Sequence, residues 1–293
     1  MAHAHHVAHQ SYGILAILVL VAALYLRGWL RVRSFYPGGI TAWRTGSFLL
    51  GLFFIWVAVA SPRAGVVHES LTAHMVQHLL LMTFAAPLIC IGEPLLALVH
   101  AMPGRVREHM LPLLRWPPTQ GLRKAIAHPA VCWLGATGAL VGWHIPALLA
   151  LGMESPGWRA IMEASFLITG LLFWWPVLQP WPSVKKPEWL IILYLFLATL
   201  PCDILSGFLV FCDRVVYPGY ASTSRPLGLS ALQDQQLAAA IMWTVVSLVY
   251  FAVGGIISAR LLSPEKSQES RIGQQPRFDT AVPFTAGQRI EAV

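Results

Sequence analysis

Charged residues are scarce in this sequence. Asp, Glu, Lys and Arg make up 11% of the chain and hydrophobic residues 56%, whereas soluble domains carry roughly 25% charged residues. Several apolar runs approach the roughly 20 residues that cross a bilayer, and a soluble fold could not bury that many. The formal net charge is +7, but the basic residues lie in short loops between apolar runs. We interpret them as topology signals and expect no nucleic-acid partner.

Other common signatures are also missing. The four cysteines form no CxxC pair, which argues against a disulfide framework or a zinc ribbon. No HExxH motif occurs: the nearest match, HMVQH, lacks the glutamate of a zinc protease. We therefore expect no enzymatic activity. The opening MAHAHHVAHQ has neither a basic region nor a cleavage site, so no cleaved signal peptide is predicted.

Seven apolar runs predict an all-α fold, a polytopic bundle of seven transmembrane helices. They cover residues 12–26, 46–60, 71–91, 127–151, 160–178, 189–211 and 231–259. Residues 94–102 are too few to cross, and the following VREHMLPLLRW mixes charge and bulk like an interfacial helix. The predicted organisation is a His-rich periplasmic N-terminus (1–11), the transmembrane domain (12–262) and a disordered cytoplasmic tail (263–293).

The distribution of basic residues orients the predicted bundle. Sixteen of the 20 Lys and Arg residues fall on one side of the predicted spans. Such a bias marks the cytoplasmic side. It predicts a multi-pass protein of the bacterial inner membrane, with its N-terminus outside the cytoplasm and its C-terminus inside.

Five ionisable residues from four of the predicted spans share one depth. They are His74, His78, His144, Asp203 and Asp234. At a rise of 1.5 Å per residue, each lies roughly 5–12 Å below the outer surface. Such residues are costly in a membrane and usually face the bundle interior. The sequence therefore predicts one polar cavity near the periplasmic face, with Pro146 and Pro201 bending their helices around it.

The residue types in this cavity suit copper. His74 and His78 are four residues apart and share a helix face, and Met75 lies close to that face. Imidazole binds copper and soft thioether selects Cu(I), while Asp203 and Asp234 could orient the rings. Each residue also has an ordinary explanation: an intramembrane histidine can bond a neighbouring helix, methionine can fill the core and Asp234 can cap a helix. His68, Glu69 and the N-terminal histidines lie at the rim and could collect metal.

Four stretches resemble signature blocks of one family, the multi-span CtaG family of cytochrome c oxidase assembly proteins. They are HMVQHLLLMTFAAPLICIGEP, GWHIPAL, SFLITGLLFWWPVL and DQQLAAAIMW. The resemblance covers roughly residues 61–259. It implies a seven-span protein needed to assemble a haem–copper oxidase, with an oxidase subunit and the lipid bilayer as partners. His74, His78, His144 and Asp234 fall on the motif positions of the family.

Two alternatives remain open at this point. The first is a copper transport or tolerance protein, which would need a polar route to the cytoplasm. Below the histidines the third span reads LLLMTFAAPLICI, without an ionisable residue, and this argues against such a route. The second is haem bound between His78 and His144.

Overall fold

The computed structural model describes residues 2–35, 40–60, 70–103, 128–178, 187–220 and 228–262, with side chains described from residue 12 onward. Within these ranges the chain is all-helical. The longer elements are α1 (Ala2–Phe35), α2 (Ala42–Ile55), α3 (Leu71–Leu79), α4 (Ala86–Ile91), α5 (Pro94–Ala101), α8 (Pro129–Trp143), α9 (Pro146–Glu154), α10 (Pro156–Leu178), α11 (Glu188–Phe211) and α12 (Ala231–Leu262). Two π-helical segments, η1 (Trp56–Ala60) and η3 (Leu80–Ala85), extend α2 and α3, and a short 3-10 turn, η4 (Pro218–Tyr220), precedes α12.

The predicted membrane-spanning architecture is confirmed. Six helices in the described ranges are long and apolar enough to cross a membrane, and a bent pair, α8 with α9, makes up to seven. The third and sixth predicted spans match closely, at Leu71–Ile91 and Glu188–Phe211. The predicted interfacial segment after residue 104 and the predicted tail from residue 263 lie outside the described residues.

The fourth span is broken beside His144. Helices α8 and α9 meet at an angle of 79°, and Pro146 is the first residue of α9. A proline cannot donate the main-chain hydrogen bond that would continue α8, and it disfavours helical backbone in the residue before it. The predicted bend at Pro146 is therefore present, whereas Pro201 lies inside a continuous α11.

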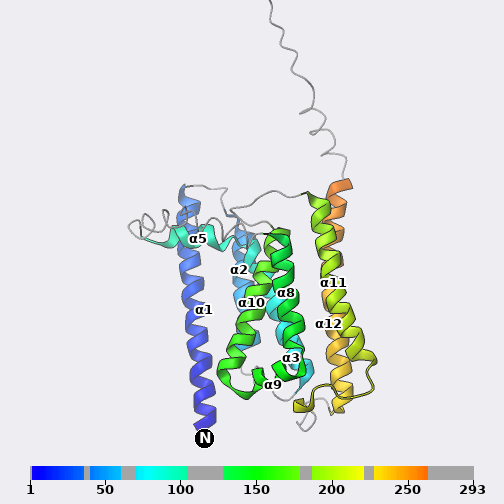
Figure 1. Ribbon diagram of the computed structural model, residues 1–293. Coiled ribbons are helices and arrows are strands. Elements are labelled where there is room, and N and C mark those ends of the chain that lie inside the picture. The colour runs from blue at the N-terminus through cyan, green and yellow to red at the C-terminus, as the bar shows by residue number, and fades with distance from the viewer. Residues whose placement is uncertain are drawn as a thin grey trace, which may run out of the picture.

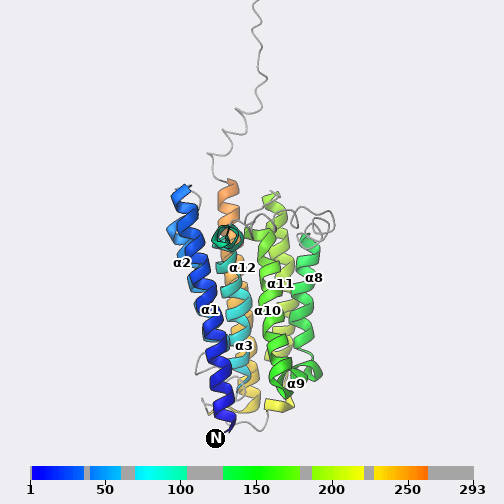
Figure 2. The ribbon, with the colours of Figure 1, turned by 90° about the vertical axis from the view of Figure 1, so that its left-hand side faces the viewer.

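The long helices run side by side between two ends of the bundle (Figure 1, Figure 2). The N-terminus and α9 lie at one end, which we call the histidine end, and α5 lies across the other, which we call the basic end (Figure 1). The C-terminus of α12 also lies at the basic end, so the two ends of the described chain are on opposite sides (Figure 1). A chain that crosses a membrane an odd number of times has its two ends on opposite sides.

Helix α3 and its continuation form the centre of the bundle. The span Leu71–Ile91 is 61% buried, more than any other candidate span in the described chain. Its middle widens into η3 just before Pro87, whose missing N–H and ring disturb a regular α-helix. Trp174 on α10 donates to the carbonyl of Met82 in this wide turn at 2.9 Å. A side chain thus satisfies a carbonyl in the irregular turn.

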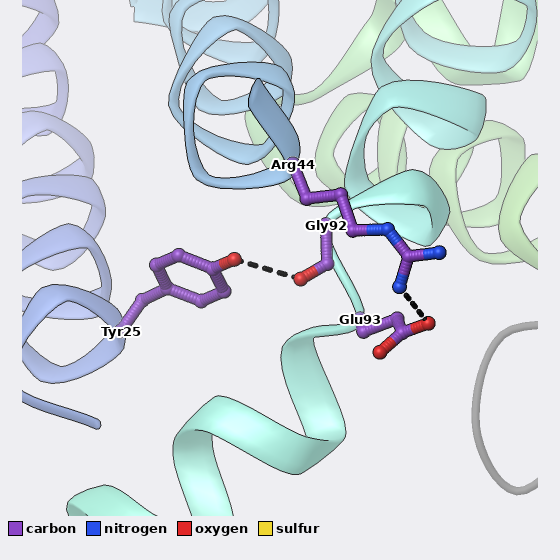
Figure 3. A network of polar contacts seen from close by, with 4 residues as sticks. All are labelled: Tyr25, Arg44, Gly92 and Glu93. Atoms are coloured by element: carbon purple, nitrogen blue, oxygen red, sulfur yellow. Dashed lines mark hydrogen bonds and ion pairs between the residues drawn. The ribbon is translucent and has the colours of Figure 1, made fainter. Parts of the chain in front are cut away.

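At the basic end, a tight turn redirects the chain from α4 into α5. Glu93 in this turn has φ 49°, a left-handed conformation that is unusual for a residue with a side chain. Figure 3 shows the contacts that fix it: Arg44 on α2 forms an ion pair with Glu93, and Tyr25 on α1 donates to the carbonyl of Gly92 at 2.7 Å. Helices α1 and α2 therefore hold this turn. Helix α5 has 8 residues and is too short to cross.

Candidate functional site

His74 and His78 lie together on α3, as their spacing predicts. Both side chains are buried, and their Nε2 atoms are 2.5 Å apart. A contact between two ring nitrogens needs one proton between them, so one Nε2 donates and the other accepts. The His78 ring also packs on Phe166 of α10, with ring centroids 3.8 Å apart.

His144 reaches the same region from the break between α8 and α9. Its ring centroid lies 6.4 Å from that of His78, and its side chain is buried. Its Nδ1 lies 2.7 Å from the carbonyl oxygen of Leu140. A carbonyl only accepts, so Nδ1 carries the proton and the Nε2 of neutral His144 carries the lone pair. That Nε2 faces the Met75 sulfur at 3.3 Å.

These four side chains form two separate pairs, His74 with His78 and His144 with Met75. They do not form a closed cage around one metal position. No group of three or more His, Cys, Asp and Glu side chains in the described ranges is arranged to hold a metal ion. Metal–nitrogen bonds of about 2.0 Å keep two ligating nitrogens at least about 3 Å apart, so the His74–His78 pair would have to separate. The His144–Met75 pair has the nitrogen and sulfur atoms that Cu(I) prefers. Nδ1 of His78 is buried without a hydrogen-bond partner.

Asp234 and Asp203, the two predicted carboxylates, contact other groups. Asp234 is buried at the first turn of α3, where it accepts from the N–H of Leu71 at 2.7 Å and from the hydroxyls of Ser70 at 2.8 Å and Thr72 at 2.6 Å. Asp203 accepts from the Ser247 hydroxyl at 3.3 Å, between α11 and α12. Ser247 is roughly 20 Å along α12 from Asp234. A role for either carboxylate at a metal stays a prediction.

The segment between α11 and α12 covers the histidines. The sequence did not predict this contact. Tyr217 donates to the carbonyl of His144 at 3.0 Å, and the Tyr220 ring centroid lies 6.2 Å from that of His74. Buried Gln235 anchors the segment by accepting from the N–H of Val216 at 2.7 Å. Burial raises the pKa of Tyr217 to about 12 and also raises that of Tyr220. Both phenols therefore stay protonated at neutral pH.

A polar pair that joins the histidine-bearing helix α3 to α10, Gln77 with Glu163, was also not predicted from the sequence. Gln77 on α3 donates from Nε2 to Glu163 on α10 and to the carbonyl of Ala58 in η1, both at 2.9 Å. Gln77 is buried, and its Oε1 has no hydrogen-bond partner. Glu163 was visible in the sequence as an acidic residue inside the fifth predicted span, the signal by which His74 and His78 were found.

The predicted rim residues lie outside the described side chains. His68 and Glu69 lie outside the described residues, and the side chains of the N-terminal histidines are not described. Their proposed role in collecting metal stays a prediction.

These features define a class: a polytopic helical membrane protein with buried imidazole and thioether groups at one end of its bundle. The family model described as cytochrome c oxidase caa3 assembly factor (Caa3_CtaG) matches residues 23–263. The chain belongs to this family, as the four signature stretches predicted.

The names of the individual relatives state no activity. The chain is 22% identical to an uncharacterised protein of Mycobacterium leprae (strain TN), a match that covers 88% of this chain and 39% of that protein. It is 24% identical to an uncharacterised protein of Mycobacterium bovis, over 78% of this chain and 35% of that protein. The chain thus spans about two-fifths of the length of the curated relatives it matches. No solved structure matches the chain.

Proposed function

We propose that this protein binds Cu(I) at the histidine end and supplies it to a subunit of a haem–copper oxidase during assembly of that enzyme. Copper is cargo in this proposal and is released after each transfer. Membership of the caa3 assembly factor family supports the link to an oxidase. The chemistry of the buried side chains supports copper.

The observation that carries the proposal is the pairing of His144 with Met75. The hydrogen bond to Leu140 fixes the ring of His144 so that the Nε2 lone pair points at the Met75 sulfur. An aromatic nitrogen and a thioether are soft, neutral ligands that favour Cu(I) over harder cations. The hydrogen bond to Leu140 is enough to set this tautomer, and the tautomer leaves Nε2 with the lone pair that a metal ligand needs.

His74 and His78 would complete the site by separating. Each ring must present a lone pair to the ion, so the contact between the two Nε2 atoms has to open. A site that must open binds less tightly than a rigid one, because part of the binding energy is used in the rearrangement. Moderate affinity suits a protein that must release its copper to a client.

Orientation supports delivery outside the cytoplasm. Arg31 and Arg44 lie at the basic end, close to α5, and the excess of basic residues marks the cytoplasmic side. We therefore place the histidine end at the periplasmic face of a bacterial inner membrane. Copper would then reach the site from the periplasm, past Tyr217 and Tyr220.

Anaerobic titration of the detergent-purified protein with Cu(I), in competition with a Cu(I) chelator, tests the proposal. We expect about one Cu(I) per chain, and His78→Ala and Met75→Leu should each weaken binding by at least about tenfold, as losses at metal sites commonly do. The matched control is Cys90→Ala, because Cys90 is buried on α4 next to the turn at the basic end. Equal copper binding by the wild type and by the double variant His74→Ala, His78→Ala would overturn the proposal.

A further inference from the structure

Ion binding by neutral ligands creates an electrostatic problem at the histidine end. Three imidazoles and a thioether hold Cu(I) without cancelling its charge, so the filled site carries a net positive charge inside the bundle. Burying an unpaired charge is unfavourable, and the protein needs an acidic group nearby to offset it. The described part of the spans offers few such groups.

Asp234 is poorly suited to this role. Its carboxylate already accepts from two side-chain hydroxyls and from main-chain N–H groups at the start of α3. The positive end of the α3 dipole offsets the same charge. Asp203, the other predicted carboxylate, is only partly buried and lies between α11 and α12 with Ser247.

Glu163 is better placed. It lies three residues before Phe166 on α10, so the two side chains share a helix face, and Phe166 packs directly on the His78 ring. The hydrogen bond from Gln77, the neighbour of His78, ties Glu163 to α3. Gln77 is itself held by the carbonyl of Ala58, so the Glu163 carboxylate is held next to the residue that precedes His78.

We propose that Glu163 is the counter-charge of the copper site, a positioning residue that stabilises the bound cation without ligating it. The inference rests on the proposed function, because it presumes that a cation occupies the histidine end. Arg159 lies one turn before Glu163 on the same helix and interacts electrostatically with both Glu163 and Tyr220. Its positive charge offsets part of the charge on Glu163 and opposes that of an incoming cation. The two residues should therefore affect copper binding with opposite signs.

Charge-changing variants at the two positions test the inference in the same Cu(I) competition titration. Glu163→Gln keeps the length of the side chain and an acceptor for Gln77, but removes the charge; it should weaken Cu(I) binding by about 10- to 100-fold. Glu163→Asp keeps the charge and should recover most of the affinity. Arg159→Gln should strengthen binding by about threefold or more, because a nearby like charge is removed.

The sign of the Arg159→Gln effect separates electrostatics from damage to the fold. Equal affinities of wild type and Glu163→Gln would overturn the inference, and so would weaker binding by both Glu163→Gln and Arg159→Gln. In either case the wild type would still bind copper, and the proposed function would stand. If the wild type binds no copper, the proposed function fails and the inference fails with it. If Glu163→Gln does not fold, Arg159→Gln alone tests the inference, because the inference requires this variant to bind Cu(I) more tightly than the wild type.

Discussion

The carboxylate of Asp234 on α12 accepts a hydrogen bond of 2.7 Å from the main-chain N–H of Leu71, the first residue of α3. The same carboxylate accepts from the hydroxyls of Ser70 and Thr72. A carboxylate at a helix N-terminus satisfies N–H groups that the helix leaves open, and it complements the helix dipole. Because α3 carries His74 and His78, this contact sets where the histidines lie against α12.

Replacing Asp234 should therefore destabilise the protein. Asp234→Asn removes the charge and turns one acceptor into a donor that faces other donors. Hydrogen bonds to charged groups contribute roughly 1.5–3 kcal/mol, so we expect a loss of about 2 kcal/mol in the free energy of unfolding, measured by denaturant titration in detergent. Asp203→Asn is the control and should lose less, because Asp203 accepts one longer bond from Ser247. Equal losses would contradict the capping role.

The turn at the basic end gives a second prediction. Glu93→Ala removes the ion pair with Arg44 but keeps a side chain at φ 49°. Glu93→Gly removes the same ion pair and also the steric strain, which amounts to about 1–2 kcal/mol for a left-handed residue. The glycine variant should therefore be the more stable of the two by about 1 kcal/mol in the same titration. A more stable alanine variant would show that the left-handed conformation is not adopted.

Sequence predicted the spans well because bilayer crossing depends on hydrophobic length, which is a local property. The break beside His144 could also be predicted from local sequence, since Pro146 cannot continue α8. The approach of His144 to His78 followed from topology, because the third span begins, and the fourth ends, at the same face.

Contacts that depend on side-chain packing between helices could not be predicted. Tyr217 covers His144 from a connecting segment with no pattern of its own. The depth of Asp234 predicts a place near the imidazoles, but depth does not give the direction of a side chain around its helix, so its bonds to Ser70, Leu71 and Thr72 could not be predicted. Glu163 was detectable as an acid inside an apolar span, whereas its partner Gln77 required the positions of α3 and α10.

The orientation of the bundle is a third prediction. Reporter fusions after Arg33, Arg115 and Lys186 should report the cytoplasm, because the excess of Lys and Arg lies on that side. Fusions after Ser70, Pro156 and Ser224 should report the periplasm. A single loop with reversed activity would contradict the seven-span topology with its N-terminus outside.

The last prediction concerns His78 in the living cell. His78→Ala removes one imidazole from the buried group, which weakens copper binding without removing His144 or Met75. Oxidase activity in the host membrane should fall under copper limitation. Added copper should restore part of it, because mass action fills a weakened site when the ligand concentration rises. Oxidase activity is compared at equal protein abundance, measured by immunoblot, because loss of a buried ring also leaves a cavity.

A purely structural histidine would behave differently. The His78 ring packs on Phe166 and contacts His74, so His78→Ala leaves a cavity whatever the role of the residue. If that role were packing alone, added copper would restore none of the lost activity. Cys90→Ala provides the comparison, since Cys90 is equally buried but lies near the basic end; it should change neither activity nor its dependence on copper. Full oxidase activity of His78→Ala under copper limitation would rule out copper delivery through His78. The oxidase link of the family would then rest on holding a client subunit while other proteins insert its cofactors.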